Sequence, residues 1–176
     1  MKFIELKLTG AFIIEPEYIE DERGFFARSY CVEEFEKRGL INKIHQCNIS
    51  YNHSKGTLRG MHYQIGEKSE VKIVRCTRGK IFDVIVDLRL HSPTYKKWQG
   101  LELSSENHKM LYIPQGFAHG FQTLEDCSEV FYQMTESFSP AHAKGVRWND
   151  PIFNIQWPFS TPSVISSKDQ QYPDYT

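Results

Sequence analysis

The feature that most constrains the fold of this chain is a regular succession of short β-strand patterns. After residue 43, runs of β-branched and aromatic residues recur about every ten residues between Gly, Asn, Ser or Pro, at residues 44–50, 57–64, 71–77, 80–88, 98–103, 110–113, 120–124 and 130–135. Such short, evenly spaced strands are typical of β-sandwiches and β-barrels. Alternating apolar residues at 2–8 and 11–14 extend the pattern toward the N-terminus. We therefore expect an all-β fold with an N-terminal β extension.

Local signals predict a few departures from this strand pattern. Residues 32–38 carry acidic residues in the first turn and are followed by Gly39, which indicates one short helix. Residues 17–24 are charged and indicate a turn, before a short aromatic strand at 25–30. Arg78-Gly79 stands between two apolar runs and predicts a tight hairpin in which the glycine supplies a positive φ. After Pro140 the pattern becomes irregular, which indicates a loop laid over the barrel.

Length and composition limit the function classes. The 176 residues fit a single domain, 1–176, and contain no repeat or linker. The net charge is -1 with no Lys/Arg-rich block, so we expect no nucleic-acid partner. No apolar run approaches the roughly 20 residues needed to cross a bilayer, so we expect no membrane insertion. Four cysteines without C-x-x-C spacing, and no signal-peptide pattern, favour a cytoplasmic protein with reduced thiols.

Two of the seven histidines, His62 and His119, lie within well-formed apolar β patterns. Strand alternation puts His62 with Gly60 and Gln64 on one face and Met61 with Tyr63 on the other. A core histidine bonded to a neighbour is the simpler interpretation. Nearby polar residues instead favour the mouth of a ligand-binding barrel.

Residues 114–120 form a P-x-G-x-x-H pattern in which Pro and Gly make a sharp turn before His119. The pattern resembles the second signature of the cupin superfamily, whose fold is the double-stranded β-helix, a jelly roll. A cupin metal site also needs an H-x-H pair and a downstream Glu, because divalent metals require three or four convergent ligands. Residues 62–64 read His-Tyr-Gln instead, so we expect no bound metal.

Several longer motifs occur in one order along nearly the whole chain: DERGFF at 21–26, LRGMHYQ at 58–64, IFDVIVDLR at 81–89, IPQGFAHGF at 113–121 and RWNDP at 147–151. Together they resemble the dTDP-4-dehydrorhamnose 3,5-epimerase family. The resemblance implies a homodimeric cupin that needs no cofactor. It also implies epimerisation of a nucleotide-linked 4-keto-6-deoxyhexose beside its carbonyl, as in rhamnose precursor synthesis for polysaccharides.

The resemblance also assigns catalytic roles. A 4-keto group acidifies the hydrogens at C3 and C5, so a base can form an enolate and an acid can return a proton from the opposite face. His62 occupies the family's base position, and Asp169 that of the carboxylate that orients the histidine. Tyr132 matches the acid, and Lys72 the lysine near the keto oxygen. On local sequence alone, Asp169 is a solvated charge and Tyr132 equally fits a core tyrosine.

Other positions match the family's substrate-binding residues. Guanidinium and imidazole donors suit a diphosphate, aromatic rings suit stacking on a base or core filling, and amides suit a polar pocket. The substrate-binding residues that the resemblance implies are Arg23, Phe26, Arg28, Gln46, Asn48, Arg59, His119 and Trp148. Arg28 and Ala143 stand where characterised members of the family tend to carry Glu. We therefore expect weaker discrimination for thymidine over other pyrimidine nucleotides than in typical relatives.

The residues leave several alternatives open. The enzyme could invert C3 alone, C5 alone or both, or act as a 3,4-ketoisomerase through the same enolate. A cupin that binds a sugar nucleotide without turnover would share the fold, although His62, Tyr132 and Asp169 together argue against it. A metal-dependent cupin oxygenase is the third alternative. The sequence does not identify the nucleobase, nor the subunit that Arg23 and Phe26 serve.

Overall fold

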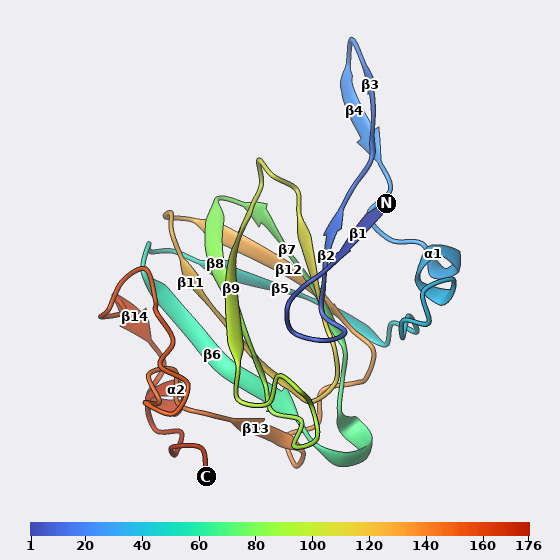
Figure 1. Ribbon diagram of the computed structural model, residues 1–176. Coiled ribbons are helices and arrows are strands. Elements are labelled where there is room, and N and C mark those ends of the chain that lie inside the picture. The colour runs from blue at the N-terminus through green and yellow to red at the C-terminus, as the bar shows by residue number, and fades with distance from the viewer.

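The computed structural model describes residues 1–176, and two antiparallel sheets form its body (Figure 1). The first sheet has the order β1 (Lys2–Glu5), β2 (Phe12–Glu15), β10 (Met110–Ile113), β7 (Lys72–Arg78), β12 (Ser128–Met134) and β5 (Gln46–Asn52). The second has the order β13 (Ala143–Gly145), β6 (Thr57–Gln64), β11 (Phe117–Thr123), β8 (Lys80–Asp87) and β9 (Trp98–Ser104). A short parallel strand, β14 (Val164–Ile165), also pairs with β6. The expected all-β jelly roll is confirmed.

The main core lies between the two sheets. Val74 and Val130 from the first sheet pack with Ile81, Ile85 and Phe121 from the second in one buried cluster. Burial of such side chains is the main favourable term in folding. Two further clusters cover the outer faces of the sheets. One lies under helix α1 (Val32–Glu36), and the other under residues 146–157.

The turn at Gly79 is not the predicted hairpin. Gly79 has a φ of +70°, as expected, but β7 belongs to the first sheet and β8 to the second. The chain therefore crosses between sheets here, close to Ser128, whose Oγ lies 2.6 Å from where a Cβ on Gly79 would be. Local sequence shows that a turn occurs, but it does not show which sheet the next strand joins.

The predicted turn at residues 17–24 is only partly correct, because Glu22 and Arg23 form a turn but the residues before them form a strand. Residues Tyr18–Asp21 form β3, which pairs with β4 (Gly24–Ala27) in a hairpin that projects from the body (Figure 1). We call this β3–β4 hairpin the arm. All four β3 side chains are exposed, so the buried alternation that marks a strand is missing there. Helix α1 is two residues shorter than predicted, and neither the 3₁₀ turn Gly66–Lys68 nor helix α2 (Ser167–Gln170) was predicted.

An irregularity in β6 determines which of its side chains face inward. His62 pairs with His119 and Arg59 with Phe121, so Gly60 and Met61 together oppose the single residue Gly120. This extra residue is a β-bulge, and it changes the alternation. As a result Arg59 and His62 both line the space between the sheets, while Met61 packs in the outer cluster. A Cβ on Gly60 would lie 2.6 Å from the Cα of Gly120, which requires glycine at this position.

None of the helices has the length and apolar character needed to cross a bilayer.

Candidate active site

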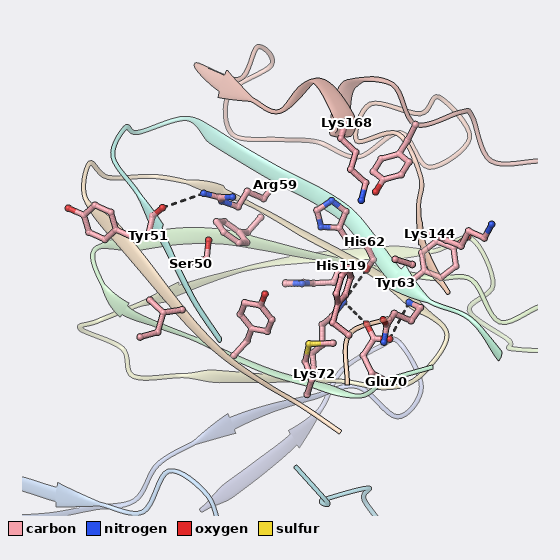
Figure 2. Close-up of a pocket in the computed structure, with 18 residues that line it drawn as sticks. Ser50, Tyr51, Arg59, His62, Tyr63, Glu70, Lys72, His119, Lys144 and Lys168 are labelled. Atoms are coloured by element: carbon pink, nitrogen blue, oxygen red, sulfur yellow. Dashed lines mark hydrogen bonds and ion pairs between the residues drawn. The ribbon is translucent and has the colours of Figure 1, made fainter. Parts of the chain in front are cut away.

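A cavity of about 430 Å³ opens between the two sheets (Figure 2). Five of the residues predicted from the sequence line it: Arg59, His62, Lys72, His119 and Tyr132. His62 and His119 come from the second sheet, whereas Lys72 and Tyr132 come from the first. A concave site with a few convergent polar groups is the usual form of a small-molecule site.

His62 and Asp169 form a close pair, although 107 residues separate them. Nε2 of His62 lies 2.7 Å from Oδ1 of Asp169, and the backbone N–H of Gly60 donates to Oδ2 at 3.2 Å. Asp169 is buried on helix α2, whose N-cap Ser166 accepts a hydrogen bond from the Asp169 N–H. Burial alone would raise the pKa of Asp169, but His62, Gly60 and Ser166 together hold that pKa below its usual range. The carboxylate is therefore charged, and His62 donates through Nε2.

Tyr132 faces the cavity from β12, in the sheet opposite His62. Burial raises the pKa of its phenol, and the nearby charge of Arg59 opposes this effect. The phenol therefore keeps its proton at neutral pH. An imidazole paired with a carboxylate and a protonated phenol thus line one cavity from facing sheets.

Lys72 is almost completely buried at the start of β7. Its Nζ lies 2.9 Å from Oε1 of Glu70 and donates to the carbonyl oxygen of His62 at 3.2 Å (Figure 2). Glu70 is buried as well. The site therefore contains a buried ion pair beside the proposed base.

His119 and Arg59 are the other nitrogen donors predicted at the site. Nε2 of His119 lies 2.9 Å from Oδ2 of the fully buried Asp83, whose pKa is raised by burial. Nε of Arg59 donates to Oδ1 of Asn52 at 2.7 Å, and this amide is itself buried. Both side chains are thus oriented by buried partners and line the cavity.

The remaining predicted residues lie outside the cavity lining. Gln46 and Asn48 lie beside it on β5, with Nε2 of Gln46 donating to Oδ1 of Asn48 at 3.2 Å and Asn48 opposite Tyr132. Trp148 lies on a loop, where its carbonyl oxygen accepts a hydrogen bond from Trp157.

Arg23, Phe26 and Arg28 are carried on or beside the arm, which points away from the body (Figure 1). Arg23 pairs with Asp21, and Arg28 lies 3.3 Å from Glu34. Phe26 is 70% exposed. Within one chain, none of these three side chains reaches the cavity.

Sequence reasoning missed Glu70, Lys168 and Tyr172, which all line the cavity. The ring of Tyr172 packs over the backbone of Gly145 and meets His62 edge to face, at 5.9 Å between ring centroids. Lys168 and Tyr172 belong to an irregular polar tail without strand or helix periodicity. Only their closeness to Asp169 in the sequence could have drawn attention to them.

The structure contains no cluster of three or more His, Cys, Asp or Glu side chains placed to hold a metal ion.

The fold and the cavity together define a jelly-roll protein in which a His–Asp pair and a tyrosine line one small-molecule cavity from facing sheets. The family model for dTDP-4-dehydrorhamnose 3,5-epimerase matches residues 5–176. The chain belongs to this family. It is an isomerase that epimerises a nucleotide-linked 4-keto-6-deoxyhexose beside its carbonyl.

Individual relatives agree with this assignment. The chain is 43% identical over 176 residues to dTDP-4-dehydrorhamnose 3,5-epimerase from Salmonella typhimurium, covering 98% of this chain and 94% of that protein. The crystal structure of the Bacillus anthracis enzyme, with TDP and PPi bound, has a TM-score of 0.95 at 43% identity and covers 99% of both chains. A Streptomyces niveus relative, 36% identical and covering 97% of this chain and 82% of that protein, is named dTDP-4-dehydrorhamnose 3-epimerase.

Proposed function

We propose that this enzyme inverts both C3 and C5 of a dTDP-linked 4-keto-6-deoxyhexose, with His62 as the base and Tyr132 as the acid. The observation that carries the proposal is that the His62–Asp169 pair and Tyr132 line the same cavity from opposite sheets. Inversion requires removal of a proton from one face of the sugar and its return to the other. Base and acid on facing sheets suit that requirement.

The hydrogen bonds of His62 indicate which ring nitrogen reacts. Nε2 donates to the Asp169 carboxylate, so Nδ1 carries the lone pair that accepts the C–H proton. The imidazolium that forms is stabilised by the same carboxylate. Electrons from the broken C–H bond move to the keto oxygen, and Tyr132 then donates its proton to the carbon from the far side.

Two further groups of residues complete the proposed reaction. The buried ammonium of Lys72 faces the keto oxygen and stabilises the negative charge of the enolate. Arg59 and His119 bind the diphosphate, for which guanidinium and imidazolium donors are well suited. We propose no cofactor, because the keto group already acidifies the neighbouring hydrogens. We also propose that the enzyme works in the cytoplasm, where its four free thiols remain reduced.

The reaction is tested by incubating the wild-type enzyme with a dTDP-4-keto-6-deoxyhexose in deuterated water. We expect deuterium at both C3 and C5 and inversion of both centres, measured by NMR of the product. Inversion at C3 alone would identify the activity named for the S. niveus relative. A carbonyl moved to C3 would identify a 3,4-ketoisomerase, and the absence of exchange would identify a binding protein.

We also propose that two copies form the working enzyme. The edge strand β5 exposes Ile49, which borders the cavity and is 67% exposed, and the arm exposes Ile19 and Phe26 at 69% and 70%. Exposed apolar residues on a sheet face and on a projecting hairpin are typical of a protein interface. Dimerisation could bring Arg23 and Phe26 to the cavity of a neighbouring copy.

Sedimentation should therefore give twice the chain mass of 20.6 kDa. Phe26→Ala should weaken binding of TDP while leaving the circular dichroism spectrum unchanged, because its ring is not part of the core of one chain. A fully active monomer would contradict the dimer proposal. Unchanged TDP binding in Phe26→Ala would contradict a role for the arm in binding.

The nucleobase preference is a further prediction. Ala143 lines the cavity and offers no side-chain acceptor, whereas thymine N3 carries a hydrogen that a carboxylate would accept. An unmet N–H costs about 1–3 kcal/mol, so we expect weaker discrimination for TDP than in typical relatives. Calorimetric titration with TDP, UDP, CDP and GDP in one buffer measures this. A preference for TDP of roughly several hundredfold corresponds to a larger free-energy difference than this cost, and it would contradict the prediction.

A further inference from the structure

The polar contacts of Lys72 leave one of its ammonium N–H donors without a partner in the protein. A lysine ammonium has three N–H donors. One is directed to Oε1 of Glu70 at 2.9 Å and another to the carbonyl oxygen of His62 at 3.2 Å. Lys72 lines the cavity, so the third donor is available to a bound substrate (Figure 2).

The carboxylate of Glu70 is itself held on both oxygens. Its side chain is 3% exposed, and Oε2 accepts the backbone N–H of Gln64 at 3.1 Å. Gln64 belongs to β6 in the second sheet, whereas Lys72 belongs to β7 in the first. Glu70 therefore connects the two sheets at the end of the cavity where Lys72 meets the strand that carries His62.

We propose that Glu70 is a positioning residue, which keeps the Lys72 ammonium charged and aims its third N–H at the keto oxygen of the substrate. This inference rests on the proposed function, in which Lys72 stabilises the enolate. Glu70 itself has both oxygens engaged by the protein, so it acts through Lys72.

The physical basis is the burial of the ammonium. A buried ammonium without a counter-charge favours its neutral form, in which the amine no longer provides a fixed positive charge. The other titratable groups that face this part of the cavity are His62 on β6, Asp83 on β8, His119 on β11 and Tyr132 on β12. Asp83 is engaged by His119, so Glu70 is the carboxylate that directly contacts Lys72.

The test is a double-mutant cycle with Glu70→Gln and Lys72→Met. Glutamine keeps the size of the side chain and can still accept from the Gln64 N–H, so it removes mainly the charge. Lys72→Met should lower kcat on the order of a hundredfold, and Glu70→Gln roughly tenfold to a hundredfold. The kcat of the double variant should be no lower than that of Lys72→Met, because the two substitutions remove the same interaction. Deuterium exchange into the substrate should slow in parallel, with TDP affinity unchanged.

The pH profile distinguishes positioning from a merely structural role. In Glu70→Gln the unpaired ammonium loses its proton more readily, so activity relative to wild type should decrease further as the pH rises. The matched control is Glu136→Gln, which removes another carboxylate that pairs with a lysine, Lys68 at 3.3 Å, but does not line the cavity. This control should keep the wild-type kcat and pH profile.

Several outcomes would overturn the inference. Multiplicative losses in the double variant, a wild-type kcat in Glu70→Gln, or a parallel loss at every pH would each contradict positioning through Lys72. If Glu70→Gln does not fold by circular dichroism, the double variant, which removes both buried charges, supplies the comparison with Lys72→Met. Wild-type activity in Lys72→Met would instead contradict the role of Lys72 in the proposed function.

Discussion

Replacement of His62 by alanine is expected to abolish detectable exchange of solvent deuterium into C3 and C5 of the substrate. The variant lacks the nitrogen that accepts the C–H proton, and removal of a general base typically costs about 10²- to 10⁴-fold in rate. NMR of the sugar in deuterated water measures the exchange directly. His91→Ala, which changes an exposed histidine outside the cavity lining, should exchange like the wild type.

The partner of His62 provides a second measure of the same mechanism. Asp169→Asn removes the charge that orients the ring and stabilises the imidazolium, so most of the exchange should be lost. The double variant should be little worse than His62→Ala, because the two residues act as a unit. Exchange at the wild-type rate in His62→Ala would show that another group is the base.

Tyr132→Phe is expected to separate the two proton transfers. The variant keeps the ring that packs against the main core but lacks the phenolic O–H. His62 can still remove and return a proton on its own face, so exchange at C3 and C5 should continue. Formation of the inverted product should decrease, on the order of a hundredfold or more.

Measurement of exchange and product stereochemistry in one NMR sample makes this comparison direct. Product formation at the wild-type rate would remove Tyr132 as the acid. Circular dichroism and TDP titration serve as the folding control. Loss of the folded state in Tyr132→Phe would favour the simpler interpretation of Tyr132 as a core residue on β12.

The strands could largely be predicted from the sequence, but their partners could not. β6 and β10 occupy the residues expected from their runs of β-branched and aromatic residues between turn residues. The turn at Gly79 was located correctly, yet it joins different sheets instead of two paired strands. Pairing in a jelly roll depends on contacts between distant residues, which local periodicity does not contain. Within the arm, β3 was missed because its side chains are exposed and carry no buried alternation, whereas β4 overlaps the aromatic strand predicted at residues 25–30.

The candidate site shows the same division. His62 and His119 stand out because they interrupt apolar strand patterns, whereas Asp169 lies in a polar tail and was identified only through the family resemblance. Glu70 gave no signal, because its role depends on burial against Lys72 and on a backbone N–H. Arg23 and Phe26 remain predictions, since one chain does not bring them to the cavity.

The bulge in β6 makes the backbone geometry of this strand as important as its side chains. Arg59 and His62 are three positions apart, which plain alternation would place on opposite faces, and they share the cavity because the bulge sets Gly60 and Met61 together opposite Gly120. A substitution at Gly60 that straightened the bulge at unchanged strand length would restore plain alternation and turn the guanidinium outward, away from Asn52, while leaving the imidazole in place. The capacity to abstract a proton would then be disconnected from the anchoring of the diphosphate. In this strand, a change of backbone geometry alone would alter substrate recognition with every cavity side chain intact.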